Sequence, residues 1–139
     1  MIGLLERADG TGDQISDYAG LWYSRPGLAA LMTIFLLSLG GFPPLAGFIG
    51  KWYVFTAAMK AGYNWLAIVG VLTSVISVFF YLRVVVMMYM TSARSSLTIP
   101  PTPRIAGAAL IASAIIVFYL GILPTQVLNW AAASIGTIF

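Results

Sequence analysis

Long apolar stretches alternate with short polar ones along this chain, and their lengths predict helices that cross a membrane. Residues 65–90 and 105–123 are almost wholly apolar, and each is about as long as the roughly 20 residues that a bilayer crossing needs. Residues 27–60 are apolar too, but they are interrupted near the middle. Two separate crossings would need about 40 residues, more than this region holds, so we interpret it as one discontinuous crossing.

The interruption lies at residues 40–44, where two glycines, Gly40 and Gly41, are followed by Pro43 and Pro44. Proline has no backbone N–H, so carbonyl groups about one turn earlier lose their helical hydrogen-bond partners. Unpaired carbonyls in a membrane are tolerated only inside protein or beside water. The sequence therefore predicts a wet, protein-lined pocket at this break.

The two ends of the chain are more polar than its middle. Residues 1–26 hold all four acidic residues of the chain and predict a solvated loop or a short interfacial turn. Residues 124–137 show weak amphipathicity, with Trp130 among the apolar positions, and predict a short helix in the membrane interface. The polar stripe of this helix is formed by Gln126, Asn129, Ala133 and Thr137.

These segments predict an all-α integral membrane protein with three transmembrane helices, the first discontinuous, and a C-terminal interfacial helix. Its membrane domain would span residues 27–139. Three crossings place the N-terminal loop and residues 91–104 on one side, which carries Arg7, Arg25, Arg94 and Arg104, whereas the other side carries only Lys60. By the positive-inside rule the N-terminal loop is cytoplasmic and the C-terminus lies outside.

Composition supports a membrane location and excludes several kinds of chemistry. Hydrophobic residues make up 60% of the chain and charged residues 8%, against roughly 25% charged in a soluble domain. Cysteine and histidine are absent, which removes thiol chemistry, haem ligation, iron–sulfur clusters and the usual zinc sites. The net charge of +3 comes from scattered cations with no basic cluster for nucleic acid.

Lys51 is the candidate catalytic residue, acting in proton transfer. A phosphate-binding loop around Gly50 and Lys51 is excluded, because that motif needs glycine where Leu45 stands and serine or threonine where Trp52 stands. Lys51 follows the break by about two helical turns, and desolvation at that depth disfavours the charged form of an amine. A lysine there could exchange a proton, although a lysine near a helix end that extends to the interface would look the same.

Arg83 is the other charge within a predicted span. A guanidinium does not lose its proton at ordinary pH, so a structural role in an ion pair or on a backbone carbonyl is favoured over proton transfer. Nothing else in the sequence indicates a nucleophile, a metal site or a cofactor site.

The motifs "SLGGFPPLAGFIGKW" and "YLRVVVMMY", at their spacing here, closely resemble subunit N of the proton-pumping NADH–quinone oxidoreductase, respiratory complex I. The resemblance extends over essentially the whole chain and implies the C-terminal part of an antiporter-like subunit. It implies that Lys51 lies on a broken helix in a proton path. It also implies a bacterial inner-membrane location, with the rest of subunit N and other membrane subunits as partners.

The resemblance implies that this chain performs no redox chemistry itself, although the complex is an NADH:quinone oxidoreductase. Flavin and iron–sulfur clusters are expected only in partner subunits, and no cofactor is expected in this chain. Two alternatives remain open. One is a subunit of a multi-subunit cation/proton antiporter, and the other is an inactive truncated protein or a membrane scaffold.

Overall fold

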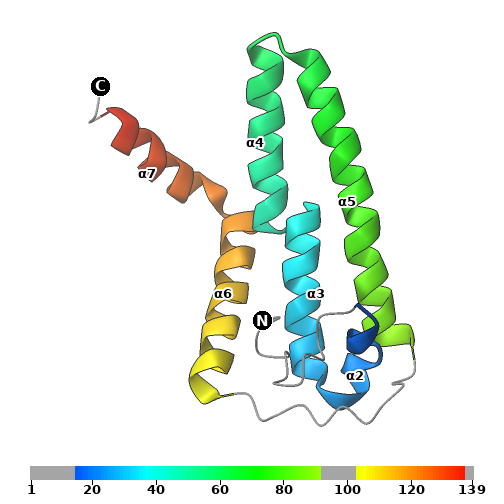
Figure 1. The fold of residues 1–139 in the computed structure, drawn as a ribbon. Coiled ribbons are helices and arrows are strands. Elements are labelled where there is room, and N and C mark those ends of the chain that lie inside the picture. Colours follow the sequence, from blue (N-terminus) through cyan, green and yellow to red (C-terminus); the bar gives the residue numbers. More distant parts are fainter. Residues whose placement is uncertain (1–14, 92–102, 137–139) are drawn as a thin grey trace.

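The structure, a computed structural model, describes residues 15–91 and 103–136 and is helical almost throughout (Figure 1). Those residues contain no β-strand, which confirms the all-α prediction. The elements in chain order are a 3-10 turn η1 (Ile15–Tyr18) and the helices α2 (Leu21–Ser24), α3 (Pro26–Gly40), α4 (Ala46–Lys60), α5 (Asn64–Met90), α6 (Arg104–Ile122) and α7 (Pro124–Gly136).

The predicted apolar segments correspond to helices with closely similar bounds. Helices α5 and α6 begin and end within one residue of the predicted 65–90 and 105–123, and both are long and apolar enough to cross a membrane. The region 27–60 divides into α3, a shorter apolar helix, and α4, with residues 41–45 between them. The last position of the predicted interfacial helix, Thr137, lies outside the described residues.

Helices α3 and α4 follow one another end to end, and α5 runs back alongside both (Figure 1). Helix α6 lies beside α3 on the side away from α5, and its C-terminal end reaches the junction of α3 and α4. Helix α7 then leaves this junction at an angle. The gap between α3 and α4 is therefore flanked by α5 and by the end of α6.

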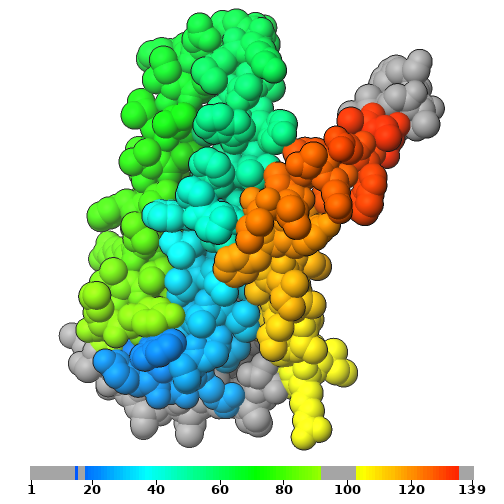
Figure 2. Space-filling model, turned by 180° about the vertical axis from the view of Figure 1, so that it is seen from behind, coloured from blue at the N-terminus to red at the C-terminus, as the bar shows by residue number. Residues whose placement is uncertain are grey.

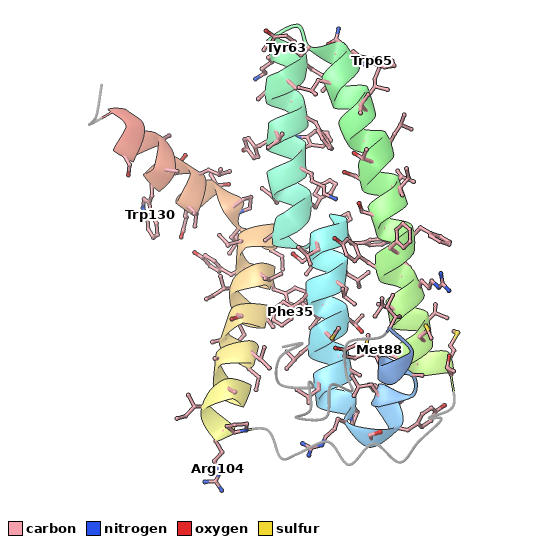
Figure 3. All side chains as sticks on the ribbon, viewed as in Figure 1. Phe35, Tyr63, Trp65, Met88, Arg104 and Trp130 are labelled. Carbon is pink, nitrogen blue, oxygen red and sulfur yellow. The ribbon has the colours of Figure 1, made fainter. Side chains whose placement is uncertain are left out.

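A small core lies at the end of the bundle where α3 begins and α5 ends. It is formed by Tyr18, Leu21, Leu28, Ala29, Met32 and Met88. Leu21 is 1% exposed and Met88 is fully buried, so this methionine has a packing role (Figure 3). The expectation of a solvated loop is wrong for Tyr18, Ala19 and Leu21, because short helical turns in this segment bury these side chains against α3 and α5.

Large apolar side chains are exposed along α5 and α6. Examples are Trp65, 76% exposed, and Ile105, 86% exposed. So much exposed apolar surface marks a face that contacts lipid or other helices rather than water. The exposure supports the membrane class that composition indicated.

Candidate functional site

Helix α3 ends in a turn that requires glycine at position 41. Gly41 has φ 85°, in the left-handed region that side chains with a Cβ rarely adopt. Its N–H donates to the Ser38 carbonyl at 3.0 Å, and the N–H of Phe42 donates to the Leu37 carbonyl at 3.0 Å. This pair of bonds is the Schellman motif, which satisfies two of the last carbonyls of a helix.

The Gly40 carbonyl is satisfied by a side chain from beyond the break. In a continuous helix it would accept from the N–H of residue 44, but Pro44 has none. The Lys51 ammonium takes that place, and its Nζ lies 2.8 Å from the Gly40 oxygen. The charge of Lys51 thus lies at the negative end of the α3 dipole, where a cation is stabilised.

The path of the Lys51 side chain explains how a residue on the second turn of α4 reaches α3. Side chains on a helix lean toward its N-terminus, and the N-terminus of α4 faces the end of α3. Lys51 passes so close to Gly41 that a Cβ on Gly41 would lie 2.8 Å from the Lys51 Cδ. Glycine at position 41 therefore serves both the turn and the approach of the lysine.

The first turn of α4 is in turn capped by α3. Leu45 is the N-cap residue of α4 and offers no side-chain cap, although a first-turn N–H needs an acceptor. The N–H of Gly47 donates instead to the Ser38 hydroxyl at 3.3 Å. Helices α3 and α4, called half-helices below, therefore cap each other across the gap, α4 through Lys51 and α3 through Ser38.

Helix α6 closes one side of the junction. A Cβ on Gly121 would collide with backbone atoms of Pro44 and Leu45, so the two backbones are in direct contact. Figure 2 shows the end of α6 and the start of α7 packed on this junction. A small apolar cavity of about 150 Å³ between Ala46 and Pro124 lies at the same corner.

Substitution of Gly121 by alanine is expected to destabilise this junction by about 1–3 kcal/mol, the usual cost of overpacking. Gly107 on the same helix is the control, because a Cβ there would meet nothing within 4 Å. The measurement is the thermal midpoint of the assembled membrane protein. A Gly121→Ala variant as stable as Gly107→Ala would contradict the close approach of α6.

A cavity of about 200 Å³ lies beside Lys51, between α4 and α5. Its walls are mostly aromatic and aliphatic, and Gly40 and Gly41 form part of one wall. Ser74 of α5 is among the residues that line it. The volume is enough for several water molecules, each of which occupies about 30 Å³ in the liquid.

The residues singled out in the sequence lie in two places. Gly40, Gly41 and Lys51 meet at the junction, with Lys51 half-buried. Pro43 and Pro44 lie in the connection, which contains a cis peptide bond between them, and both are exposed. Arg83 is exposed on α5 and has no hydrogen bond or ion pair with any described side chain, so its structural role stays a prediction.

Ser38, Gly47, Ser74 and Gly121 also belong to the site and were not identified from the sequence. Ser38 could have been identified from the local sequence, since a hydroxyl just before a Gly-Gly-x-Pro-Pro break can cap the helix that follows the break. Ser74 and Gly121 had none, because their roles depend on how α5 and α6 pack against the junction.

These features describe a helical protein with the exposed apolar surface of a membrane protein, in which Lys51 and Ser38 link helices α3 and α4 across residues 41–45. Residues 1–77, which include the break and Lys51, match the family described as "NADH:quinone oxidoreductase/Mrp antiporter, TM". The chain belongs to this family.

Similar proteins agree with this assignment. The chain is 43% identical over 99% of its length to NADH-quinone oxidoreductase subunit N of Trichlorobacter lovleyi, and 44% identical over 91% to that of Moorella thermoacetica. It also matches a chain in the structure of respiratory complex I from Thermus thermophilus with bound aureothin, with TM-score 0.75, 32% identity and 83% of this chain covered. The resemblance to subunit N is confirmed.

The chain spans about a quarter of the length of these relatives. It covers 28% of the T. lovleyi protein, 27% of the M. thermoacetica protein and 26% of the T. thermophilus chain. The similarity thus concerns one region of a larger membrane subunit.

Proposed function

We propose that this chain forms part of a proton-translocating membrane subunit of NADH–quinone oxidoreductase, and that Lys51 exchanges the proton. The observation that carries the proposal is the hydrogen bond from the Lys51 ammonium to the Gly40 carbonyl at the break. An ammonium in a membrane helix is costly unless it is paired or hydrated, so an intramembrane lysine indicates a functional site. Here it has one carbonyl partner and two further N–H groups available for water.

The proposed placement makes α3 and α4 together one discontinuous crossing, with α5 and α6 as the second and third. Helix α3 has 15 residues, or about 22 Å at 1.5 Å per residue, which is too short to cross the bilayer core of about 30 Å alone. Helix α7 lies in the interface, with Trp130 exposed as its anchor (Figure 3). The N-terminal loop is cytoplasmic and the C-terminus lies outside a bacterial inner membrane.

In the proposed mechanism Lys51 alternates between two states. In the charged state its ammonium donates to the Gly40 carbonyl and is stabilised by the C-terminal end of α3. When it releases the proton to water in the adjoining cavity, this attraction weakens and the amine can move away from the carbonyl. Reprotonation from the other side restores the contact. The C-terminal end of α3 therefore binds the charged form of Lys51 in preference to the neutral form.

Redox energy comes from partner subunits in this proposal. Flavin and iron–sulfur clusters lie in those partners, and the other membrane subunits and the rest of subunit N complete the proton path. Among residues 15–91 and 103–136, no cluster of His, Cys, Asp or Glu could hold a metal ion.

A second candidate is a subunit of a cation/proton antiporter. The matching family covers both classes by its description, and a lysine at a helix break would serve either. The relatives named as subunit N favour the oxidoreductase. Sodium uptake into vesicles driven by a pH gradient, without NADH or quinone, would favour the antiporter.

Alanine in place of Lys51 tests the proposal in the complete complex. Proton pumping in inverted membrane vesicles is expected to fall on the order of a hundredfold, because a positioned acid–base group contributes at least about that factor to a proton transfer. Lys60, exposed in the last turn of α4, provides the control Lys60→Ala. Wild-type pumping by fully assembled Lys51→Ala would refute the proposal.

A further inference from the structure

The cavity beside Lys51 has a second polar side chain, on α5. A stripe of α5 faces this cavity, formed by Val71, Ser74, Val75 and Val78. These positions lie on one face of the helix, because they are spaced by three and four residues. Ser74 is the polar member of an otherwise aliphatic stripe.

Two contacts define the position of Ser74 relative to Lys51 along the axes of α4 and α5. On one side, Phe55 packs against Gly70, one turn before Ser74. On the other side, a Cβ on Gly40 would lie 3.4 Å from Val78, one turn after Ser74. Lys51 lies one turn before Phe55, and α4 and α5 run in opposite directions (Figure 1). Ser74 therefore lies opposite Lys51, about one turn of α5 away from the level of Gly40.

The hydroxyl of Ser74 differs from others in the interior of the described helices. A serine or threonine within a helix commonly donates to the carbonyl four residues earlier. Such bonds are made by Thr33, Thr56, Thr73, Ser77, Ser113 and Ser134. Ser38 instead accepts from Gly47. The Ser74 hydroxyl has no hydrogen bond with any described residue, and Ser74 is one of the residues that line the cavity.

We propose that Ser74 is a positioning residue for proton exchange at Lys51, and that its hydroxyl holds a water molecule in the cavity within reach of the ammonium. The inference rests on the proposed function of Lys51. A hydroxyl suits this role because it can donate and accept at the same time. The aliphatic neighbours of Ser74 leave that water few other polar partners on α5, so its place depends on this side chain.

The proton step can be written through these groups. A Lys51 N–H bond breaks, the electron pair stays on Nζ, and the proton joins the water oxygen. The resulting hydronium passes one proton to the next water, while the Ser74 hydroxyl keeps its own proton and holds the first water in place by a hydrogen bond. Lysine ends as a neutral amine, serine and the first water are unchanged in composition, and one proton has left the site.

Removal of the hydroxyl tests this role in the complete complex. Ser74→Ala is expected to lower proton pumping per assembled complex about three- to tenfold, the factor that corresponds to one lost neutral hydrogen bond. It should also raise the solvent deuterium isotope effect, since proton transfer becomes slower relative to other steps. Ser77→Ala is the matched control, because the Ser77 hydroxyl is bonded to Thr73 on the same helix.

Two further variants distinguish the effect of the hydroxyl group from the effect of side-chain size. Ser74→Thr keeps a hydroxyl and is expected to restore most of the pumping, whereas Ser74→Cys keeps the size but has a weak donor and should behave like alanine. If Ser74→Ala fails to assemble, this pair still decides the question. Equal activity of the threonine and cysteine variants would overturn the inference.

The double variant distinguishes this inference from the proposed function. If Ser74 acts through Lys51, adding Ser74→Ala to Lys51→Ala should cause no further loss. Suppose that Lys51→Ala loses pumping while Ser74→Ala keeps the wild-type pumping rate and isotope effect. This result would overturn the role of Ser74 and leave the proposed function of Lys51 intact. Wild-type pumping in Lys51→Ala would overturn both.

Discussion

Arginine in place of Lys51 is expected to stop proton pumping at least as completely as alanine does, although it keeps the positive charge. A guanidinium can still donate to the Gly40 carbonyl, which the lysine contacts at 2.8 Å, and it still complements the end of α3. It does not release its proton under these conditions. A permanently charged group at the break would stay in contact with the Gly40 carbonyl. The neutral state that proton release requires could then not form.

This substitution separates a capping role from a proton-exchange role. The measurement is proton pumping in vesicles, normalised to the amount of assembled complex and compared with Lys51→Ala. Lys60→Arg is the control for an extra guanidinium on α4, because Lys60 is exposed at the far end of that helix. If Lys51→Arg pumped like the wild type, Lys51 would serve only to cap α3, and the proposed proton path would have to avoid it.

The position of the break was predictable because its causes are local. Two prolines remove backbone donors wherever they stand, and Gly41 is the residue type that ends a helix in the left-handed conformation. The observed gap at residues 41–45 lies one residue beyond the predicted 40–44. The shift arises because the Schellman turn keeps Gly40 in the helix.

The partner of Lys51 was not predictable from spacing alone. Counting residues along the chain places Lys51 two helical turns away from Pro44, which suggests that Lys51 is too far from the end of α3 to contact it. In the structure α4 begins close to the end of α3, where Gly47 contacts Ser38, and the lysine side chain leans toward α3. The distance in space therefore depends on the path of residues 41–45, which the residue types do not determine.

The packing of the N-terminal segment shows a second limit of prediction from the sequence. Tyr18 and Leu21 lie within residues 1–26, whose four acidic side chains indicate a solvated segment. Their burial depends on the ends of α3 and α5 lying beside them, where the Gly20 N–H also donates to the Met87 carbonyl at 3.2 Å. The burial of apolar residues in such a segment thus becomes visible only when their tertiary partners are known.

Alanine in place of Gly47 is expected to disrupt the junction of α3 and α4, although alanine is the better helix former. A Cβ on Gly47 would collide with the carbonyl group of Ser38, which is backbone and cannot rotate away. The half-helices would have to separate, with a cost of about 1–3 kcal/mol for overpacking. Separation would also break the bond from the Gly47 N–H to the Ser38 hydroxyl and lengthen the contact of Lys51 with Gly40.

Gly50 provides the matched control three residues further along α4, because a Cβ there would meet nothing within 4 Å. Gly50→Ala should leave the complex as stable as the wild type or more stable by about 0.5–1 kcal/mol, since alanine restricts the unfolded chain. The two variants are compared by thermal midpoint and by proton pumping per assembled complex. Reduced pumping in Gly47→Ala with wild-type pumping in Gly50→Ala would tie function to the contact between the half-helices. If both variants pumped normally, the distance between Lys51 and the end of α3 would not control proton exchange.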